Sequence, residues 1–191
     1  MSGLFWHIAL RRMPRWNIGM EEQVALFNEH GQVVGQAPRS QVRAENLRHG
    51  ASSIVVFNAD GKIFVHQRTQ IKDVYPGLYD FTAGGVIQVA EDPDESARRE
   101  AKEELGVDSE LVGLGEANYC DANTTYRAFL YWTIAHGPLS LQAEEVACGF
   151  WVAQNELITD ITRDPARYMP DSVELLLDWL RGLNGNLPVA H

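Results

Sequence analysis

Residues 85–107 read GVIQVAEDPDESARREAKEELGV and contain the strongest local signals in the chain. Asp92 is a favourable N-cap residue, Pro93 suits the first helical position, and Glu95 completes a capping box. Gly106 follows the last apolar residue and predicts the end of the helix, since glycine adopts the left-handed conformation at little steric cost. The sequence therefore predicts a helix between Asp92 and Leu105.

Three glutamates of this predicted helix share one face. At the helical pitch, Glu100, Glu103 and Glu104 fall within an arc of about 100°, and small or apolar residues cover the adjoining arc. Carboxylates at these spacings repel one another unless a cation lies between them. A glutamate-rich helix face alone is most often a solvated surface. A hard divalent cation such as Mg²⁺, which also binds phosphate oxygens, is the alternative interpretation.

The spacing of the whole stretch distinguishes these two interpretations. The pattern G-x5-E-x7-R-E-A-x-E-E-x-G-V resembles the Nudix box at every fixed position, and a chance match is expected on the order of once in a million chains. The resemblance to the Nudix hydrolase family implies an α/β fold. It is expected to be an α/β/α sandwich with a mixed β-sheet, in which the box forms a catalytic loop-helix-loop.

The resemblance extends from Val24 to Leu180, which is nearly the whole chain after its first twenty residues. Within this family, the sequence is similar to a bacterial branch often labelled YfcD-type, which is related to type I isopentenyl-diphosphate isomerase. The segments that carry this likeness are Leu47-Arg48-His49, Gln67-Arg68, Tyr75-Pro76-Gly77, Thr82-Ala83-Gly84-Gly85 and Ala135-His136-Gly137-Pro138.

The Nudix box implies a metal site for Mg²⁺ or Mn²⁺. By position in the box, Glu100 and Glu104 are the expected ligands, and Glu103 binds the metal directly or through a water. The backbone carbonyl of Gly85 is a further expected ligand, because glycine lets the backbone come close to the ion.

The same resemblance implies hydrolysis of a substrate in which a diphosphate is linked to another group. Water attacks one phosphorus in line, and positioning and charge neutralisation supply most of the catalysis. The general base is expected to be a glutamate. Glu100 and Glu103 are candidates, and so is Glu145, because many family members use a glutamate on a late loop.

Four further residues are candidates for supporting roles. Glu91 and Arg99 resemble the structural ion pair of the family, which holds the loop and the helix of the box together. Arg68 and Lys72 flank the entry to the Tyr75-Pro76-Gly77 turn and can neutralise a substrate phosphate, although ordinary surface cations are an equally good interpretation.

Two other functions stay open. An isopentenyl-diphosphate isomerase needs a cysteine and a histidine-rich metal site, but Gly84 stands at the position of the cysteine, and Val86 and Val42 stand at positions of histidine ligands. His49 resembles the remaining histidine ligand and is better explained as a packed side chain. The second alternative is a non-catalytic Nudix ligand-binding module, against which the retention of all four box glutamates argues.

Composition limits the partners. The 16 basic and 26 acidic residues give a formal charge of −10, which disfavours nucleic acid and anionic membrane as partners. The longest apolar run, residues 128–135, is too short to span a bilayer. Two cysteines without metal-ligand spacing indicate reduced thiols and a cytoplasmic protein. The expected partner is a small-molecule diphosphate, and a homodimer stays open.

Three regions are expected along the chain: an N-terminal extension over residues 1–20, a Nudix hydrolase domain over 21–183, and a flexible tail over 184–191. The expected elements of the domain are a hairpin (24–27 and 33–36), a short helix through 42–47, a second hairpin (53–57 and 63–67), buried strands at 126–134 and 150–152, and a helix over 171–181.

Overall fold

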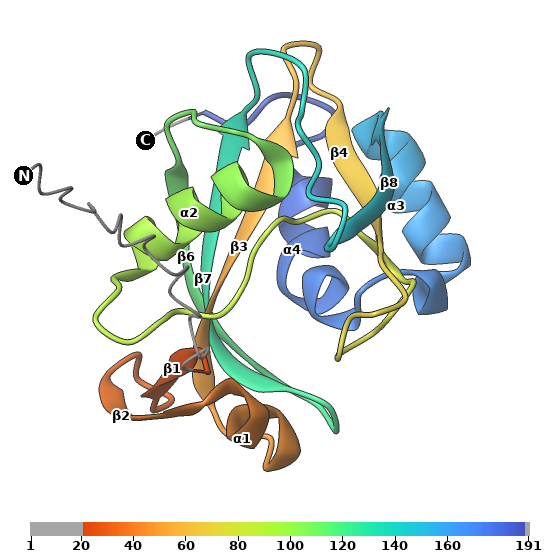
Figure 1. Ribbon diagram of the computed structural model, residues 1–191. Coiled ribbons are helices and arrows are strands. Elements are labelled where there is room, and N and C mark those ends of the chain that lie inside the picture. Colours follow the sequence, from red (N-terminus) through yellow and green to blue (C-terminus); the bar gives the residue numbers. More distant parts are fainter. Residues whose placement is uncertain (1–20, 190–191) are drawn as a thin grey trace, which may run out of the picture.

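The computed structural model describes residues 21–189, so the predicted extension over residues 1–20 lies outside the described part (Figure 1). A mixed β-sheet carries helix α2 on one face and helices α3 and α4 on the other, which confirms the predicted α/β/α sandwich. The elements are β1 (Gln23–Phe27), β2 (Val33–Pro38), α1 (Arg39–Ala44), β3 (His49–Phe57), β4 (Ile63–Arg68), β5 (Tyr79–Asp80), α2 (Pro93–Leu105), β6 (Val112–Cys120), β7 (Thr125–Ile134), β8 (Val146–Val152), α3 (Gln154–Arg163), a 3-10 turn (Pro165–Arg167) and α4 (Pro170–Gly182).

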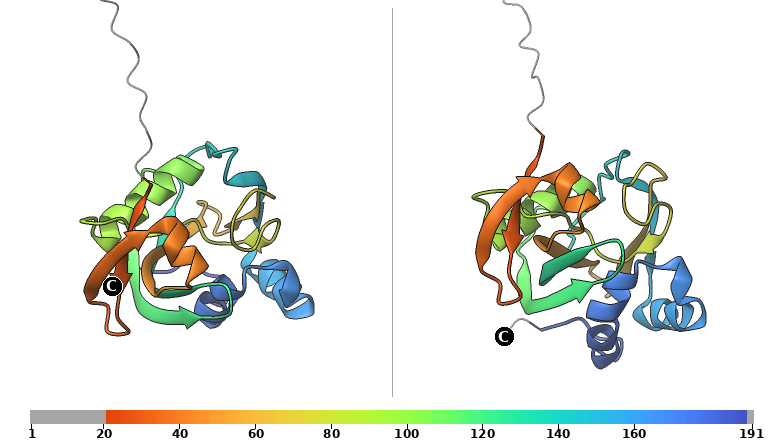
Figure 2. Two further views of the ribbon diagram at one scale, coloured as in Figure 1. Left: turned by 60° about the horizontal axis from the view of Figure 1, so that its bottom comes forward. Right: turned by 90° about the horizontal axis from the view of Figure 1, so that it is seen from below.

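Strand β3 lies at the centre of the sheet. Strand β3 pairs in parallel with β7 along the whole length of β3. Strand β7 in turn pairs antiparallel with β6. On the other side the sheet continues through β4, which pairs antiparallel with β5 and β8. The β1–β2 hairpin joins the sheet at the start of β3, and Figure 2 shows this hairpin and α1 on the opposite side of the molecule from α3 and α4.

Strands β3 and β4 diverge from each other. The predicted hairpin has the expected strands, but their register contains only the pair Phe57 and Ile63, next to the turn. Beyond this point β3 binds residues 83–87 instead: the amide of Ile54 donates to the carbonyl of Ala83 (2.8 Å), and the amide of Ser52 donates to that of Gly85 (2.9 Å). The first residues of the box therefore occupy the gap between the two strands.

Each face of the sheet has its own apolar core. Ala97, Ala101 and Leu105 are the buried apolar positions of α2 and pack on residues of β3 and β7. On the other face, side chains from α3 and α4 such as Leu157 and Leu180 pack against β3 and β7. These two cores fix α2 in position, so that its glutamate face meets the gap between β3 and β4.

Several elements differ from the sequence prediction. Strand β8 starts at Val146, before the predicted start, and Phe150 on this edge strand is 46% exposed and not buried. Helix α1 ends at Ala44 and not at Leu47, because the backbone of Asn46 has a positive φ of 47°. Strand β6 and helix α3 were not predicted, since β6 is largely exposed and contains two glycines, and α3 begins without a capping side chain.

The described part of the chain, residues 21–189, contains no helix that is both long enough and apolar enough to cross a membrane.

The capping box of α2 generates a stability prediction. The Asp92 carboxylate accepts a hydrogen bond from the amide of Glu95 (2.8 Å). We expect Asp92→Ala to lower the free energy of unfolding by about 1 kcal/mol in urea denaturation, because this amide loses its partner. The control Asp178→Ala removes an exposed carboxylate of α4 and is expected to change stability by less than about 0.5 kcal/mol. Equal stabilities of Asp92→Ala and the unaltered protein would contradict this role of Asp92.

Candidate active site

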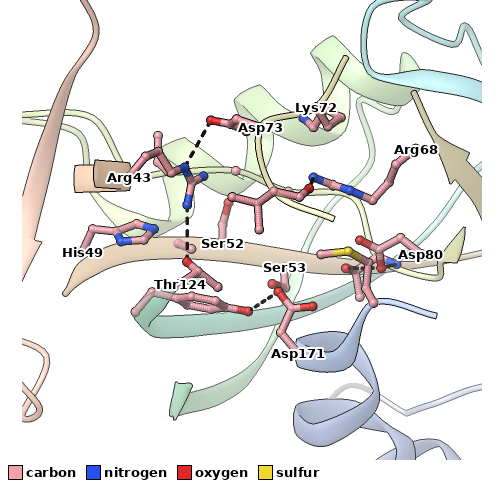
Figure 3. Close-up of a pocket in the computed structure, with 18 of the residues that line it drawn as sticks. Arg43, His49, Ser52, Ser53, Arg68, Lys72, Asp73, Asp80, Thr124 and Asp171 are labelled. Atoms are coloured by element: carbon pink, nitrogen blue, oxygen red, sulfur yellow. Dashed lines mark hydrogen bonds and ion pairs between the residues drawn. The ribbon is translucent and has the colours of Figure 1, made fainter. Parts of the chain in front are cut away.

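A polar cavity opens where β3 and β4 diverge (Figure 3). Residues at the start of β3, the end of β4 and the loop before α2 form its walls, and α1 closes it on the side away from α4. Its lining includes four basic side chains and buried hydroxyl and carboxylate groups. Gly84 and the first residue of the box, Gly85, form part of the wall. The start of the box therefore borders a cavity whose basic side chains suit an anionic ligand.

Glu104 is the most buried glutamate of the box. Its Oε2 accepts a hydrogen bond from the amide of Gly84 at 3.1 Å. Burial, and next the charge of Glu100, raise the pKa of Glu104 to about 8, and the ammonium of Lys72 acts in the opposite direction. The Glu104 carboxyl group is therefore held against Gly84, which lines the cavity, and Lys72 compensates its ionised form only in part.

Glu100 lies directly against the backbone of Gly85. A Cβ atom at Gly85 would be only 2.4 Å from Oε1 of Glu100, so a side chain at this position would displace the carboxylate. Burial raises the pKa of Glu100, and Arg99 opposes this effect. The Gly85 carbonyl accepts a hydrogen bond from the amide of Ser52 and keeps a second lone pair. Glycine at position 85 thus allows the Glu100 carboxylate to approach the backbone whose carbonyl oxygen is the other expected metal ligand.

Arg99 connects three of the box glutamates. Its Nε and Nη2 donate to the two carboxylate oxygens of Glu91, at 2.7 Å and 3.0 Å. Its Nη1 contacts Oε1 of Glu100 at 2.6 Å and Oε2 of Glu103 at 3.2 Å. Glu103 is the outermost of these groups, with 56% of its side chain exposed. The bidentate contact with Glu91 joins the loop before α2 to the helix.

The donors at this wall fit a hard divalent cation. Within residues 21–189, no three acidic, histidine or cysteine side chains surround one point, because Arg99 lies between Glu100 and Glu103. Nevertheless, Glu100, Glu104 and the Gly85 carbonyl offer only oxygen atoms. Glu104 is buried, Glu100 is largely buried with 12% of its side chain exposed, and the pKa of each carboxyl group is raised. Oxygen donors carrying excess negative charge are the ligands that Mg²⁺ prefers.

The other predicted site residues meet around Lys72, near Glu104. Lys72 forms an ion pair with Glu145, although 73 positions separate them in the chain. Burial, and next the charge of Arg68, lower the pKa of Lys72, whereas Glu104 raises it. Arg68 donates to the backbone carbonyls of Val74 (2.8 Å) and Tyr75 (3.3 Å) and pairs with no carboxylate in the described part of the chain. The structure thus brings Arg68 and Lys72 to the cavity, and Lys72 lies near both Glu145 and Glu104.

The sequence prediction missed part of the cavity lining. Arg39 and Arg43 of α1 reach it from one side. Asp80 and Asp171 lie at its floor, where Asp171 accepts a hydrogen bond from the hydroxyl of Tyr126 at 2.8 Å. The only sequence signal for the arginines is their spacing of four residues, which places both on one helix face without indicating what that face meets.

The positions that an isomerase would use have other surroundings. A Cβ atom at Gly84 would be 2.0 Å from the carbonyl oxygen of Ser52, so this backbone has no room for a cysteine side chain. His49 is buried, and its Nδ1 lies 3.0 Å from the carbonyl oxygen of Leu47. This geometry supports the interpretation of His49 as a packed histidine bonded to the backbone.

Comparisons with known proteins give consistent relatives. The NUDIX domain family matches residues 47–172. The uncharacterized Nudix hydrolase YfcD of Escherichia coli (strain K12) is 40% identical over 170 residues, which are 88% of this chain and 92% of that protein. The crystal structure of DR0079 from Deinococcus radiodurans is similar with a TM-score of 0.68 and 23% identity, covering 84% of this chain and 98% of that one. The NUDIX domain of Shewanella oneidensis NrtR, complexed with ADP ribose, has a TM-score of 0.50 and 16% identity, covering 64% and 88%.

The burial of His49 predicts a pH-dependent stability. Burial lowers the pKa of His49 from 6.5 to about 4, so the unfolded chain binds this proton at higher pH than the folded chain. The contribution of neutral His49 to the free energy of unfolding is therefore complete above about pH 6.5. It is lost as the pH falls towards 4, by up to about 1.4 kcal/mol per pH unit. Urea denaturation of His49→Asn should show a shallower loss of stability in this window.

The exposed residue His30 provides the control for this experiment, because its side chain is 74% exposed. His30→Asn should keep the slope of the unaltered protein between pH 6.5 and 4. Identical slopes for His49→Asn and the unaltered protein would show that His49 is not held neutral by burial.

Proposed function

Because this chain belongs to the Nudix family and is therefore a hydrolase of pyrophosphate bonds, we propose that it cleaves the diphosphate linkage of a nucleoside diphosphate derivative or related organic pyrophosphate. We propose Mg²⁺ or Mn²⁺ as the cofactor. The observation that supports this proposal most strongly is the placement of Glu100 and Glu104, two buried carboxylates, beside a cavity lined with basic side chains.

The reaction requires one bond to form and one to break. The oxygen of water forms a bond to one phosphorus, the bridging P–O bond breaks in line, and a proton is released to a base. Glu100, Glu104 and the Gly85 carbonyl would hold the cation, which when bound neutralises charge on the phosphate oxygens and makes water more acidic. Arg99 would keep α2 and the preceding loop together through Glu91.

Arg68 and Lys72 can stabilise the charge that the phosphate groups carry. The guanidinium of Arg68 is held by two backbone carbonyls, which fix its position and leave its charge uncompensated. Lys72 lies near both Glu104 and Glu145. Cations held in place before the substrate binds are the arrangement that favours the transition state, because little reorganisation is then needed.

We assign the general base to Glu145. Glu100 is buried and bound by Arg99, and Glu103 lies on the exposed side of the same arginine. Glu145 is 29% exposed, and one of its carboxylate oxygens forms an ion pair with the cavity-lining residue Lys72. Its backbone is fixed by a hydrogen bond from the amide of Thr69 to its carbonyl (3.1 Å). A carboxylate that is held in place and still reaches water suits proton abstraction.

Both alternative functions are disfavoured by specific features. The close contact of Gly84 with Ser52 argues against an isomerase that needs a cysteine there. A non-catalytic module has no need for Glu91, Glu100, Glu103 and Glu104 together, and all four are present. ADP ribose in the NUDIX domain of NrtR is itself a nucleoside diphosphate derivative, which supports this class of substrate for the present chain.

Replacing a buried box glutamate tests the catalytic role. We expect Glu104→Gln to lower phosphate release with Mg²⁺ by at least about 100-fold, since a carboxylate ligand is lost. The free energy of unfolding in EDTA should not fall, because burying a neutral amide costs less than burying a charge. The control Glu156→Gln alters an exposed residue of α3 and should keep full activity. A Glu104→Gln variant with the original rate would reject the proposed function.

A second comparison identifies the general base. We expect Glu145→Gln to lower kcat by about 10²–10⁴-fold and Glu103→Gln to have a smaller effect. The neighbouring residue Glu144, whose side chain is exposed, provides the matched control, and Glu144→Gln should behave as the unaltered enzyme. If Glu103→Gln showed the larger loss of kcat, the base would have to be assigned to the helix and not to the loop.

A further inference from the structure

Four of the 16 basic residues in this acidic chain line one cavity. They form two groups on different elements. Arg68 and Lys72 come from β4 and the following loop, whereas Arg39 and Arg43 lie one helical turn apart on α1. Figure 3 shows Arg43 and His49 at one end of the cavity and Arg68 and Asp80 at the other. The cavity is therefore lined by two groups of cations that come from different elements.

The arginines of α1 share one carboxylate. Oδ2 of Asp73 lies 3.3 Å from Nε of Arg43 and 3.7 Å from Nε of Arg39. The side chain of Asp73 is 45% exposed, whereas that of Arg43 is only 22% exposed. The cations are thus more deeply placed than their counter-ion. An exposed carboxylate in such a position contributes little to stability and is readily displaced by a stronger anion.

Arg43 has unused hydrogen-bonding capacity. Its Nε is buried and has no partner with hydrogen-bond geometry among residues 21–189, although Asp73 is near. Its Nη1 donates to the hydroxyl of Thr124 at 3.3 Å, which fixes the side chain against the β6–β7 turn. A buried donor without an acceptor is costly, and an anion with several oxygens in a suitable position removes this cost.

The α1 arginines are held by other partners than Lys72 is. Lys72 and Glu145 lie on the β8 side of the cavity near Glu104, whereas Arg43 is fixed to Thr124 on the β7 side. Arg39 is held by Glu22 at 2.9 Å, so its position is also defined. An anion held between Arg39 and Arg43 would therefore lie on the α1 side of a diphosphate bound at Lys72.

We propose that Arg39 and Arg43 bind a phosphate monoester that the substrate carries in addition to the diphosphate, and that Asp73 occupies this subsite in the free protein. The proposal rests on the proposed function for the reaction itself. Water still adds only to the anhydride, and the monoester stays intact and contributes binding energy. The planar donors of arginine match phosphate oxygens in pairs, which makes two such side chains a good phosphate site.

Binding of inorganic phosphate to the full chain in EDTA tests the subsite without catalysis. With ionic strength held constant by NaCl, we expect saturable binding in calorimetry. Arg43→Gln should weaken the Kd about tenfold, since a charge-assisted contact is lost. Asp73→Asn should tighten it several-fold, because the competing carboxylate is neutralised. The control Arg181→Gln, on α4, should leave it unchanged.

Two outcomes of this experiment would overturn the subsite. In one, Arg43→Gln binds phosphate as the unaltered protein does, while Arg68→Gln loses binding, so that phosphate occupies the diphosphate end. In the other, Asp73→Asn weakens binding, which would make Asp73 a structural partner of the arginines. Circular dichroism of each variant shows whether it is folded, and the opposite directions expected for Arg43→Gln and Asp73→Asn separate binding from general damage.

Matched substrates test the class of compound. Coenzyme A and its 3′-dephospho form differ by one phosphate monoester, as do NADP⁺ and NAD⁺. With Mg²⁺, we expect kcat/KM to be about tenfold higher for the phosphorylated member of a pair, and this ratio should fall towards one in Arg43→Gln. A ratio of one or less in the unaltered enzyme would reject the substrate class. If no diphosphate compound is hydrolysed, the proposed function fails, whereas the phosphate-binding experiment still decides the subsite.

Discussion

The burial of Glu100 and Glu104 against the backbone of Gly84 and Gly85 is the constraint on which the rest of the site depends. Two carboxylates removed from water repel each other and lose solvation, so each raises the free energy of the folded protein. Their position is enforced by the apolar face of α2, which packs on β3 and β7. Charge compensation must then come from neighbouring cations, and the same requirement makes this wall a binding site for a hard cation.

The cavity follows from the topology of the sheet. Strand β3 pairs in parallel with β7, and β4 pairs with β8. Strands β3 and β4 therefore separate beyond the pair Phe57–Ile63, on the side away from the turn that joins them. The loop before α2 fills one part of the gap, and the remaining part is the cavity. The segment after β4 is joined to α1 by the ion pair Asp73–Arg43 and to the loop before β8 by the ion pair Lys72–Glu145. Arg39, Arg43 and Lys72 are therefore fixed by ion pairs, and Arg68 is fixed by backbone carbonyls.

The parts that could be predicted from the sequence are those with local signals. Helix α2 was predicted because its cap, its capping box and its terminal glycine all lie within fifteen residues, and all three are present as expected. Strand β6 has no comparable signal, since most of its side chains are exposed. The contact of Lys72 with Glu145 and the approach of Arg39 and Arg43 to the box depend on tertiary packing. No spacing in the sequence specifies them.

Crystals soaked in Mn²⁺ provide the most direct test of the central claim, since the anomalous signal of manganese locates the ion independently of activity. The account predicts a strong peak at bonding distance, about 2.0–2.6 Å, from carboxylate oxygens of Glu100 and Glu104. A cavity wall without manganese under saturating conditions, or manganese bound only at exposed carboxylates elsewhere, would contradict it.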